Sequence, residues 1–582
     1  MQIVETTEEA EKLLSPSDES VEAAGLFDKH EDEYLLSLGL PKSWLLVIRK
    51  VKTDDDLLTI MESLPEEVAE RLFRLAGGEL VTPPAPVAPE QPISASPDNL
   101  RRFWVVQDAA DLREILDKPL ADWVRFLHPS QQELAKGRFN GPAKVTGSAG
   151  TGKTVVAMHR AAHLATQGKR VLLTTFVKTL CDNIQHNLEL LCTAEQRERI
   201  TVATVHSQAL RLARDAEFRV NPADDQTVIK LIERFRDHYG ALFDKDFLLA
   251  EWNGVVVNQG VLFWEEYRDA RRIGRGRGLQ VRQRKQIWNV FQRVFESLQE
   301  KRLAVWPAIC RRAEEALQSG QIKSPFDGII VDEIQDLKPQ EIRLLAALAA
   351  PHPGNLMLVG DAGQRIYPGG FSLKSLGIDV RGRSRVLRIN YRTTEQIRRF
   401  ADGIIPDAAD DLDGGTEARK GTRSLLRGPE PTTRGFKKAP DQVPFVVQQI
   451  ETLLGQGLQP GEIAVFGRSK ARYEPLAEAL RDKNLPVHEL ASEGGHESPP
   501  GINLGTMHRA KGLEFKVVFA YDCSEGIMPH EHTLQKYRDP ADYDAARLRE
   551  KQLLYVSITR ARDEAYITWA GRPSPFLPKE DT

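Results

Sequence analysis

The stretch Gly147-Ser148-Ala149-Gly150-Thr151-Gly152-Lys153-Thr154 has the G-x-x-x-x-G-K-T spacing of a phosphate-binding loop. Residues 143–146 are expected to form a strand before the loop, and an apolar helical pattern begins at Val155. This is the strand–loop–helix context that the motif requires. Backbone N–H groups and the helix N-terminus can surround phosphate oxygens. We expect Lys153 to contact the β- and γ-phosphates and Thr154 to bind Mg²⁺. The alternative is a glycine turn before an ordinary helix; we predict that these eight residues bind ATP with Mg²⁺.

A second motif makes an ordinary glycine turn less plausible. Ile329-Ile330-Val331-Asp332-Glu333 is an apolar segment that ends in two acids. A buried strand is not expected to end in carboxylates unless its C-terminal edge faces a site. Asp332 is therefore predicted to bind the Mg²⁺, and Glu333 to accept the proton of an attacking water. The pair predicts hydrolysis of the nucleotide.

Composition sets wide limits on the class of protein. The chain has 582 residues, enough for roughly three to five domains. The net charge of −4 requires any nucleic-acid surface to be a local basic channel. The cysteines Cys181, Cys192, Cys310 and Cys523 form no C-x-x-C pair, which argues against a zinc site or a disulfide framework. No stretch approaches eighteen apolar residues, so we expect a cytoplasmic protein without a membrane partner.

The segments of the chain differ in composition. Residues 1–33 are acidic and expected to be flexible, whereas residues 34–80 have the spacing of a small helical module. Prolines recur across residues 81–98, which predicts an extended linker. Beyond it, short apolar segments alternate with helical patterns, as is typical of parallel α/β domains. The predicted strands include residues 171–174, 329–331, 357–359, 463–466 and 517–520.

Further motifs follow in a fixed order. They are Thr174-Thr175-Phe176, Thr204-Val205-His206-Ser207, Asp332-Glu333-Ile334-Gln335-Asp336, Gly360-Asp361-Ala362-Gly363-Gln364-Arg365-Ile366-Tyr367, Asn390-Tyr391-Arg392, Thr506-Met507-His508-Arg509-Ala510-Lys511-Gly512-Leu513-Glu514-Phe515 and Leu554-Tyr555-Val556-Ser557-Ile558-Thr559-Arg560-Ala561. From about residue 127 to the C-terminus, the chain resembles the UvrD/Rep-type helicases of superfamily 1.

The resemblance implies an α/β fold with two RecA-like P-loop NTPase domains and parallel sheets. The first would comprise residues 99–207 and 326–385, and the second residues 386–582. Residues 208–325 would form a mainly helical accessory insertion. Members of the family usually carry a second insertion, but residues 469–501 are too few to hold it. We therefore predict that this insertion is absent.

The resemblance also assigns roles at the nucleotide. Gln131, with Gln132 as a neighbouring candidate, would read the adenine edge, and Tyr391 would stack on the base. Glu514 would bind the ribose hydroxyl. Gln364 would sense the γ-phosphate beside the predicted base Glu333, and Arg392 and Arg560 would be arginine fingers from the second domain.

Contacts to a nucleic-acid strand are implied for residues outside the nucleotide site. Thr175, Phe176, Thr204 and His206 match the family's strand-binding segments, although Phe176 could equally be a core residue. His508 and Arg509 would link the strand to the nucleotide. Many relatives have Trp-Arg-Gly after Gln-x-Ile-Tyr, where this chain has Pro368-Gly369-Gly370-Phe371. Tyr367 or Phe371 could partly replace the missing stacking residue.

The most basic stretch of the chain is residues 268–285, where glycines separate arginines. We predict that Arg275 and Arg277 contact phosphates of the strand or of the duplex, with Tyr267 and Trp288 as stacking surfaces. The alternative is a solvated face that nearby acids neutralise.

Two functions remain open at this stage. The first is an ATP-dependent DNA helicase or translocase that moves on single-stranded or tailed DNA, 3′-to-5′ as the resemblance implies. The second is an ATP-gated nucleic-acid-binding switch that signals to a protein partner on the N-terminal helical module with little unwinding. No residue distinguishes a DNA from an RNA track.

Overall fold

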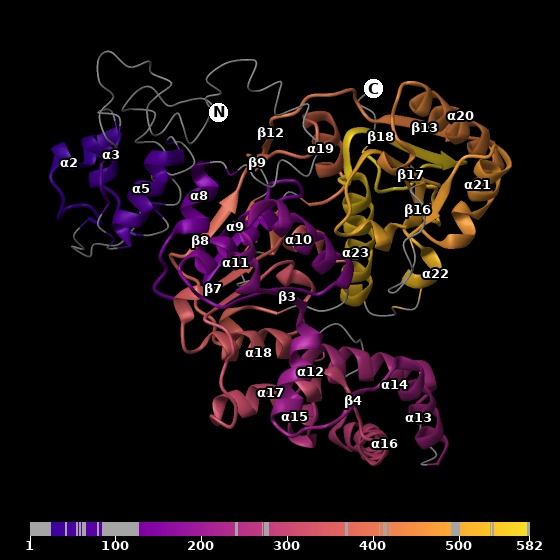
Figure 1. The fold of residues 1–582 in the computed structure, drawn as a ribbon, viewed down its shortest axis with the longest axis horizontal. Helices are drawn as coiled ribbons and strands as arrows, with labels where there is room; N and C mark the ends of the chain where they lie inside the picture. Colours follow the sequence, from indigo (N-terminus) through magenta and orange to yellow (C-terminus); the bar gives the residue numbers. More distant parts are fainter. Residues whose placement is uncertain are drawn as a thin grey trace. The chain divides into compact units, whose positions relative to one another are not determined.

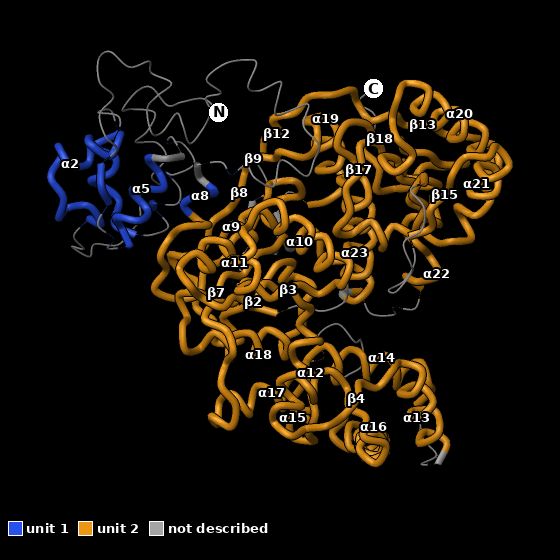
Figure 2. The backbone as a smooth tube through the Cα atoms, viewed as in Figure 1, with its two compact units in different colours: residues 1–133 blue, residues 134–582 orange. Residues whose placement is uncertain are grey.

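The computed structural model describes residues 25–40, 44–53, 56–57, 60, 64, 66–77, 79, 81–83, 127, 129–238, 243–270, 272, 279–366, 371–406, 408–410, 416–418, 421–490, 501–535, 537 and 540–578. They belong to two compact units, residues 1–133 and 134–582 (Figure 2). Within these ranges, none of the helices has the length and apolar character needed to span a bilayer.

The first unit contains a small helical core. Its helices include α2 (Asp32–Ser37), α3 (Leu45–Arg49) and α5 (Glu66–Ala76). Phe27, Trp44 and Leu72 are buried in one apolar cluster. The Tyr34 hydroxyl donates to the carbonyl of Val81 over 2.5 Å. The core thus includes Phe27, which lies before the bound predicted at residue 34. Helix α8 (Pro129–Lys136) begins in this unit.

The second unit contains two six-stranded sheets, and all neighbouring strands within each are parallel. The first sheet has the order β3 (Ile200–Thr204), β2 (Val171–Thr175), β6 (Gly328–Val331), β7 (Leu356–Val359), β1 (Ala143–Gly147) and β8 (Ser384–Leu387). Figure 1 labels β3, β7 and β8 of this sheet. Four of these strands, β1, β2, β6 and β7, are buried along their whole length, as expected for a sheet covered on both faces. The helices that accompany this sheet are α9 (Lys153–Thr166), α10 (Lys178–Leu191), α11 (Ala194–Glu198) and α18 (Pro339–Ala349).

The second sheet has the order β13 (Thr432–Phe436), β18 (Ala561–Ala570), β17 (Phe515–Tyr521), β14 (Ile463–Gly467), β16 (Ile502–Thr506) and β15 (Val487–Glu489). Its helices are α19 (Glu395–Asp402), α20 (Gln442–Gly455), α21 (Lys470–Asp482), α22 (Glu531–Leu534) and α23 (Pro540–Ile558). All five strands predicted from the sequence are present, and the predicted α/β class with parallel sheets is confirmed.

Short elements join these layers. Strand β9 (Ile389–Asn390) follows the edge strand β8 and pairs with β12 (Arg423–Ser424), and β10 (Ala408–Asp410) pairs with β11 (Thr416–Ala418). The 3-10 helices are η5 (Ile334–Asp336), η6 (Pro353–Asn355), η7 (Ala362–Gln364), η8 (Lys374–Leu376), η9 (Ala439–Asp441), η10 (Pro460–Glu462) and η11 (Met507–Ala510). Between β14 and β16, the described residues contain α21 and β15 and no separate folded insertion.

The helical segment between β3 and β6 has two parts. Helices α12 (Val205–Asp215) and α17 (Trp306–Gln318) pack into the core of the first sheet. Between them, α13 (Asp225–His238), α14 (Lys245–Glu251), the π-helix η4 (Trp252–Val257), α15 (Trp264–Asp269) and α16 (Val281–Glu300) have a core of their own. Strands β4 (Asn221–Pro222) and β5 (Leu303–Ala304) pair where the chain leaves and re-enters this core.

A buried ion pair lies inside this second core. The Glu251 side chain is fully buried and accepts hydrogen bonds from Arg272 Nε and from the Tyr267 hydroxyl, each over 2.8 Å. Arg272 also lies over the Tyr267 ring. A buried carboxylate is stable only with such partners.

Arg272→Ala should therefore destabilise this core selectively. Removing one partner of a buried ion pair costs about 3–5 kcal/mol. Hydrogen exchange should accelerate in α13–α16 while the first sheet stays protected, because the two cores are separate. Arg268→Ala is the control, since Arg268 and its partner Asp269 are both exposed to solvent. Equal exchange in the two variants would show that the pair does not stabilise this segment.

Candidate nucleotide site

The glycine-rich loop connects β1 to α9 through a backbone that only glycine fits easily. Gly150 and Gly152 both have a φ of 79°. A Cβ on Gly150 would lie 2.3 Å from Asn390 Oδ1, and one on Gly147 would lie 2.6 Å from Thr151 Oγ1. Side chains at these positions would displace the loop. The loop therefore presents bare backbone at the start of α9, as a phosphate cradle requires.

Lys153 lies in the first turn of α9 and points back into the loop. Its Nζ donates to the carbonyls of Gly147 and Ser148, over 2.7 and 2.8 Å. Burial lowers the pKa of Lys153, while the nearby Asp361, Glu333 and Asp332 carboxylates oppose that effect. The ammonium group thus lies among the loop atoms that would surround a phosphate.

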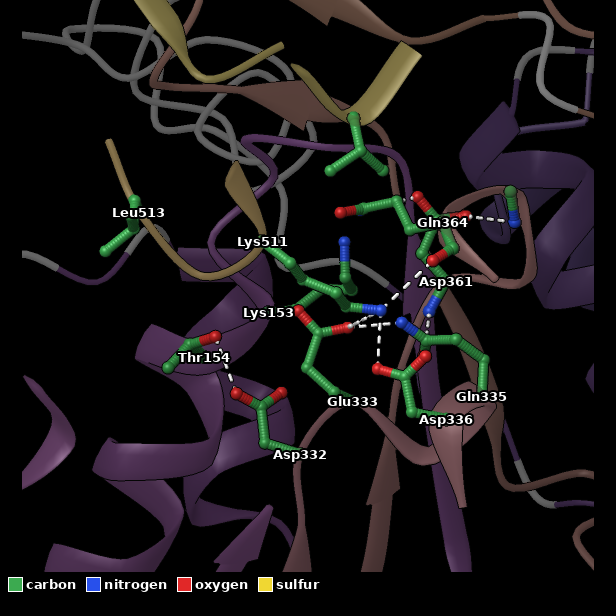
Figure 3. Close-up of polar contacts among 12 residues, drawn as sticks. Lys153, Thr154, Asp332, Glu333, Gln335, Asp336, Asp361, Gln364, Lys511 and Leu513 are labelled. Carbon is green, nitrogen blue, oxygen red and sulfur yellow. Dashed lines mark hydrogen bonds and ion pairs between the residues drawn. The ribbon is translucent and has the colours of Figure 1, made fainter. Parts of the chain in front are cut away.

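Thr154 and Asp332 supply the oxygen atoms predicted to hold a metal. Thr154 Oγ1 donates to Asp332 Oδ2 over 2.7 Å (Figure 3). Burial, and then the Glu333 carboxylate, raise the pKa of Asp332 to about 7. A divalent cation would offset this repulsion between carboxylates. No cluster of three or more His, Cys, Asp or Glu ligands occurs in the described part of the chain. Thr154 and Asp332 nevertheless fit Mg²⁺, which is usually held by one or two carboxylates together with phosphates.

Glu333 follows β6 in a left-handed conformation, with φ 54° and ψ 42°. This conformation is uncommon for a residue with a side chain. Burial alone would raise the pKa of Glu333, but the cations Lys511, Lys153 and Arg560 outweigh it and lower that pKa. The Gln335 amide also donates to the carboxylate. Glu333 is therefore held ionised, as a proton acceptor must be.

Lys511 crosses from the second sheet's domain to the acidic edge of the first. Its Nζ lies 2.5 Å from Asp336 Oδ2 and 4.0 Å from Glu333 Oε2 (Figure 3). It also donates to the Gln364 carbonyl over 3.1 Å. Burial raises the pKa of Asp336 to about 6, although Lys511 acts in the opposite direction. The lysine thus joins the domain of the second sheet to the edge of the first sheet that carries Glu333 and Asp336.

Gln364 and Arg560 meet across the same domain boundary. Arg560 Nη2 donates to Gln364 Oε1 over 2.9 Å, and Gln364 Nε2 donates to Asp361 Oδ2 over 2.8 Å. Burial lowers the pKa of Arg560 to about 10, and the positive charge of Arg392 contributes in the same direction. At neutral pH the guanidinium stays charged and faces the first domain.

Arg392 is placed by a turn that also contacts the glycine-rich loop. Asn390 Nδ2 donates to the Ala149 carbonyl over 3.1 Å. Asn390 Oδ1 accepts from the backbone N–H groups of Arg392 and Thr393 over 2.9 and 3.0 Å. The Arg392 guanidinium forms an ion pair with Glu514. The predicted finger and the predicted ribose ligand thus contact each other directly.

The residues predicted to bind the base are Tyr391 and Gln131, with Gln132 as the neighbouring candidate. The backbone N–H of Tyr391 donates to the Gly150 carbonyl over 2.9 Å, and burial raises the pKa of the Tyr391 hydroxyl. Gln131 lies in α8, within the first compact unit, and is buried. Its contact with adenine stays a prediction. The Gln132 amide donates to the Leu127 carbonyl over 3.2 Å.

The predicted strand contacts occupy two separate regions. Thr175 is fully buried at the end of β2, and its hydroxyl has no hydrogen-bond partner among the described residues. Thr204 caps α12 by accepting from the Ser207 N–H over 3.2 Å. His508 and Arg509 follow β16, and burial lowers the pKa of His508 to about 4.

Several predicted stacking residues are core residues instead. Phe371 is only 9% exposed and packs in the core of the first sheet, so its ring is not available to a base in this conformation. Tyr267 and Trp288 are buried in the second helical core, so their prediction as stacking surfaces is wrong. Tyr367, Arg275 and Arg277 lie outside the described residues.

Three of the described arginines in that basic stretch contact other groups of the protein, whereas Arg282 is exposed. Arg272 pairs with the buried Glu251, and Arg268 pairs with Asp269. Arg284 donates to the backbone carbonyls of Leu279 and Arg268. For Arg272 and Arg268, the structure supports the alternative that nearby acids neutralise the charge.

Sequence reasoning missed several residues that complete the site. They are Asn390, Lys511, Asp336, Asp361 and Tyr555, whose hydroxyl accepts from the Ala149 N–H over 3.4 Å. Each lies inside a motif already quoted from the sequence. The signal was therefore present, but only the fold shows which motif residues face the loop.

Comparisons with known proteins agree with this geometry. Residues 127–369 match the UvrD/REP helicase N-terminal domain, and residues 488–572 match the UvrD-like helicase C-terminal domain. The ATP-dependent DNA helicase UvrD2 of Mycobacterium bovis is 23% identical over 565 residues, covering 76% of this chain and 79% of that protein. DNA helicase IV of Escherichia coli is 24% identical, covering 78% of this chain and 71% of that protein.

A solved structure, the C-terminal domain of a possible DNA helicase from Lactobacillus plantarum, is 24% identical with a TM-score of 0.22, covering 32% of this chain and 91% of that one. The two family matches together span more than half of this chain and include the glycine-rich loop, the acidic pair Asp332 and Glu333, and Arg560. The chain belongs to the UvrD/Rep-type helicases of superfamily 1, a family of ATP-hydrolysing enzymes.

Proposed function

We propose that this chain is an ATP-dependent DNA helicase or translocase that moves along single-stranded DNA in the 3′-to-5′ direction. The observation that carries the proposal is the contact of Arg560 and Lys511, from the second RecA-like domain, with Gln364 and Asp336 of the first. Hydrolysis at this site is thereby connected to the relative position of two domains, as a motor requires.

The chemistry at this site can be assigned to side chains of the chain. Backbone N–H groups of the glycine-rich loop and Lys153 would hold the phosphates. Ionised Glu333 would orient the attacking water and take its proton. Mg²⁺ held by Thr154 and Asp332 would neutralise charge on the β- and γ-phosphate oxygens. Arg392 and Arg560 would stabilise the charge that develops on the γ-phosphate during transfer.

Domain movement follows from the same electrostatics. The γ-phosphate would attract Arg392 and Arg560 towards the loop, which favours the closed arrangement of the two domains. Loss of that charge after hydrolysis weakens the attraction, so the closed arrangement is less favoured. Alternating grip by strand-binding residues on the two domains would convert the cycle into movement along a strand.

DNA as the track is supported by the relatives, which are named DNA helicases. The 3′-to-5′ direction rests on the family resemblance. The second RecA-like domain has no separate insertion among its described residues. This arrangement favours translocation along a strand over the unwinding of long duplexes. The ATP-gated switch, with a partner on residues 34–80, stays an alternative prediction.

Lys153→Ala and Glu333→Gln should separate binding from chemistry. Lys153→Ala should weaken nucleotide binding and hydrolysis together, because it removes a charge from the phosphate cradle. Glu333→Gln should keep the nucleotide bound while turnover is lost, because an amide cannot accept the proton. The measurement is nucleotide affinity beside steady-state turnover. A Glu333→Gln protein with normal turnover would refute the assignment of the base.

Arg392→Ala and Arg560→Ala should each reduce strand-stimulated turnover by orders of magnitude, with a smaller effect on ATP affinity. Arginine fingers contribute about 10³–10⁵ to the rate. Lysine should not restore full activity, because a point charge cannot reproduce the planar guanidinium. Arg399→Ala is the control, since Arg399 is exposed and pairs with Glu395 on α19. Normal stimulated turnover in either test variant would make that arginine structural.

Oligonucleotides should identify the track and the direction. Single-stranded DNA should stimulate hydrolysis more than single-stranded RNA or blunt duplex. Displacement should occur on a duplex with a 3′ tail and not on one with a 5′ tail. Stimulation by single-stranded DNA without displacement or translocation on either tail would favour the switch. No stimulation by any nucleic acid would contradict both functions.

A further inference from the structure

Three aromatic rings from distant parts of the sequence form one cluster, which we call the aromatic platform: Phe176, His206 and Trp306. The His206 and Trp306 rings stack with centroids 4.0 Å apart and an interplanar angle of 4°. Phe176 meets the His206 ring edge-on, with centroids 5.7 Å apart. Phe176 follows β2, and His206 lies in the first turn of α12 after β3. Trp306 begins α17, which packs beside α12 (Figure 1).

A buried acid fixes the orientation of this platform. His206 Nε2 lies 2.8 Å from Glu341 Oε1, and the Glu341 side chain is only 3% exposed. Glu341 is itself held in α18, where its other oxygen accepts from the Lys338 N–H over 2.9 Å. A ring that is oriented by a buried carboxylate and stacked on an indole loses little further freedom on binding, which favours recognition.

The platform differs from the other aromatic residues considered for stacking. His206 keeps 22% of its side chain exposed, and Phe176 and Trp306 are also only partly buried. Phe371, Tyr267 and Trp288 are buried in cores. The platform also lies where the parallel strands β2 and β3 end, which is the edge of an α/β sheet at which ligands bind.

We propose that the aromatic platform is a stacking site for a nucleobase of the single strand, and that Trp306 is its principal ring. The proposal rests on the proposed function, because it assigns a base contact within the track. The Trp306 indole packs against the core and has one face on His206, so a base would contact the part that stays exposed. Every base has a π-face, so such a contact holds a strand without reading its sequence. His206 positions Trp306 by stacking on it, and Glu341 positions His206.

A stacking contact differs from a phosphate contact in two measurable ways. It needs the base, so it disappears on a strand that has only sugar and phosphate. It releases no counterions, so it leaves the salt dependence of binding unchanged. A variant that merely disturbs the fold would weaken binding to both kinds of strand alike.

The experiment measures the affinity of the full-length protein for oligo(dT) and for an abasic oligomer of the same length, at several salt concentrations. The test variants are Trp306→Ala, Trp306→Leu, which keeps an apolar side chain for packing, and Trp306→Phe, which keeps an aromatic ring. Trp569→Ala is the matched control, since Trp569 is also partly buried but lies in β18 beside Gly435.

Trp306→Ala and Trp306→Leu should bind oligo(dT) about tenfold more weakly, the order expected for one base–aromatic stack. Trp306→Phe should retain most of the affinity, and Trp569→Ala all of it. On the abasic oligomer, the wild type and all variants should bind alike, with unchanged salt slopes.

Unchanged affinity of Trp306→Ala and Trp306→Leu for oligo(dT) would overturn the inference while leaving the proposed function intact. The same result follows if these variants lose equal affinity for the abasic oligomer, or if Trp306→Phe fares no better than Trp306→Leu. If the wild type itself does not bind oligo(dT), the strand-binding function fails, and this inference fails with it.

Discussion

Charge buried between two parallel sheets is the constraint on which this molecule depends. The Lys511 side chain is 4% exposed and that of its partner Asp336 is fully buried. If one of these charges were removed, water could not hydrate the other. Isolating either charge would cost several kcal/mol. The two RecA-like domains must therefore meet with the edge that carries Asp332, Glu333 and Asp336 facing Lys511 and Arg560. Lys511 and Arg560 thus both connect the two domains and lower the pKa of Glu333.

The glycine-rich loop satisfies a second constraint, which is steric. Its backbone passes so close to Asn390 and Thr151 that side chains on Gly150 or Gly147 would collide with them. Asn390 in turn fixes the backbone at Arg392 through its amide oxygen. The Asn390 side chain thus holds both the glycine-rich loop and the backbone of Arg392. A change in the position of the loop is transmitted to Arg392 by direct hydrogen bonds.

The proposed strand-binding side of the first domain is stabilised in a different way. Here Phe176 follows β2 and His206 follows β3, and the Glu341 carboxyl beside His206 is buried. Orientation comes from a hydrogen bond between His206 and the buried Glu341 carboxyl and from ring stacking, and the aromatic rings stay partly exposed. Partly exposed rings of this kind suit bases, whereas a flexible basic loop suits phosphates. The two kinds of contact would contribute separately to affinity and to its salt dependence.

Local patterns in the sequence were enough to predict the α/β class and to single out the glycine-rich loop and the acidic end of β6. Lys153, Thr154, Asp332 and Glu333 are specified by short motifs because each lies at the end of a buried strand or at the start of the following helix. All five predicted strands are present, since uninterrupted apolar runs of that length are buried in parallel sheets.

Only the tertiary structure decided which side chains face one another. Tyr267 and Trp288 were expected at a surface but fill a core, because aromatic residues on amphipathic helices pack inward when neighbouring helices can cover them. Lys511 pairs with Asp336, which lies 175 residues earlier in the chain, and Trp306 stacks on His206, which lies 100 residues earlier. The spacing of residue types in the sequence sets local conformation and burial. Contacts between side chains that are so far apart in the sequence form only when the sheets and helices pack together.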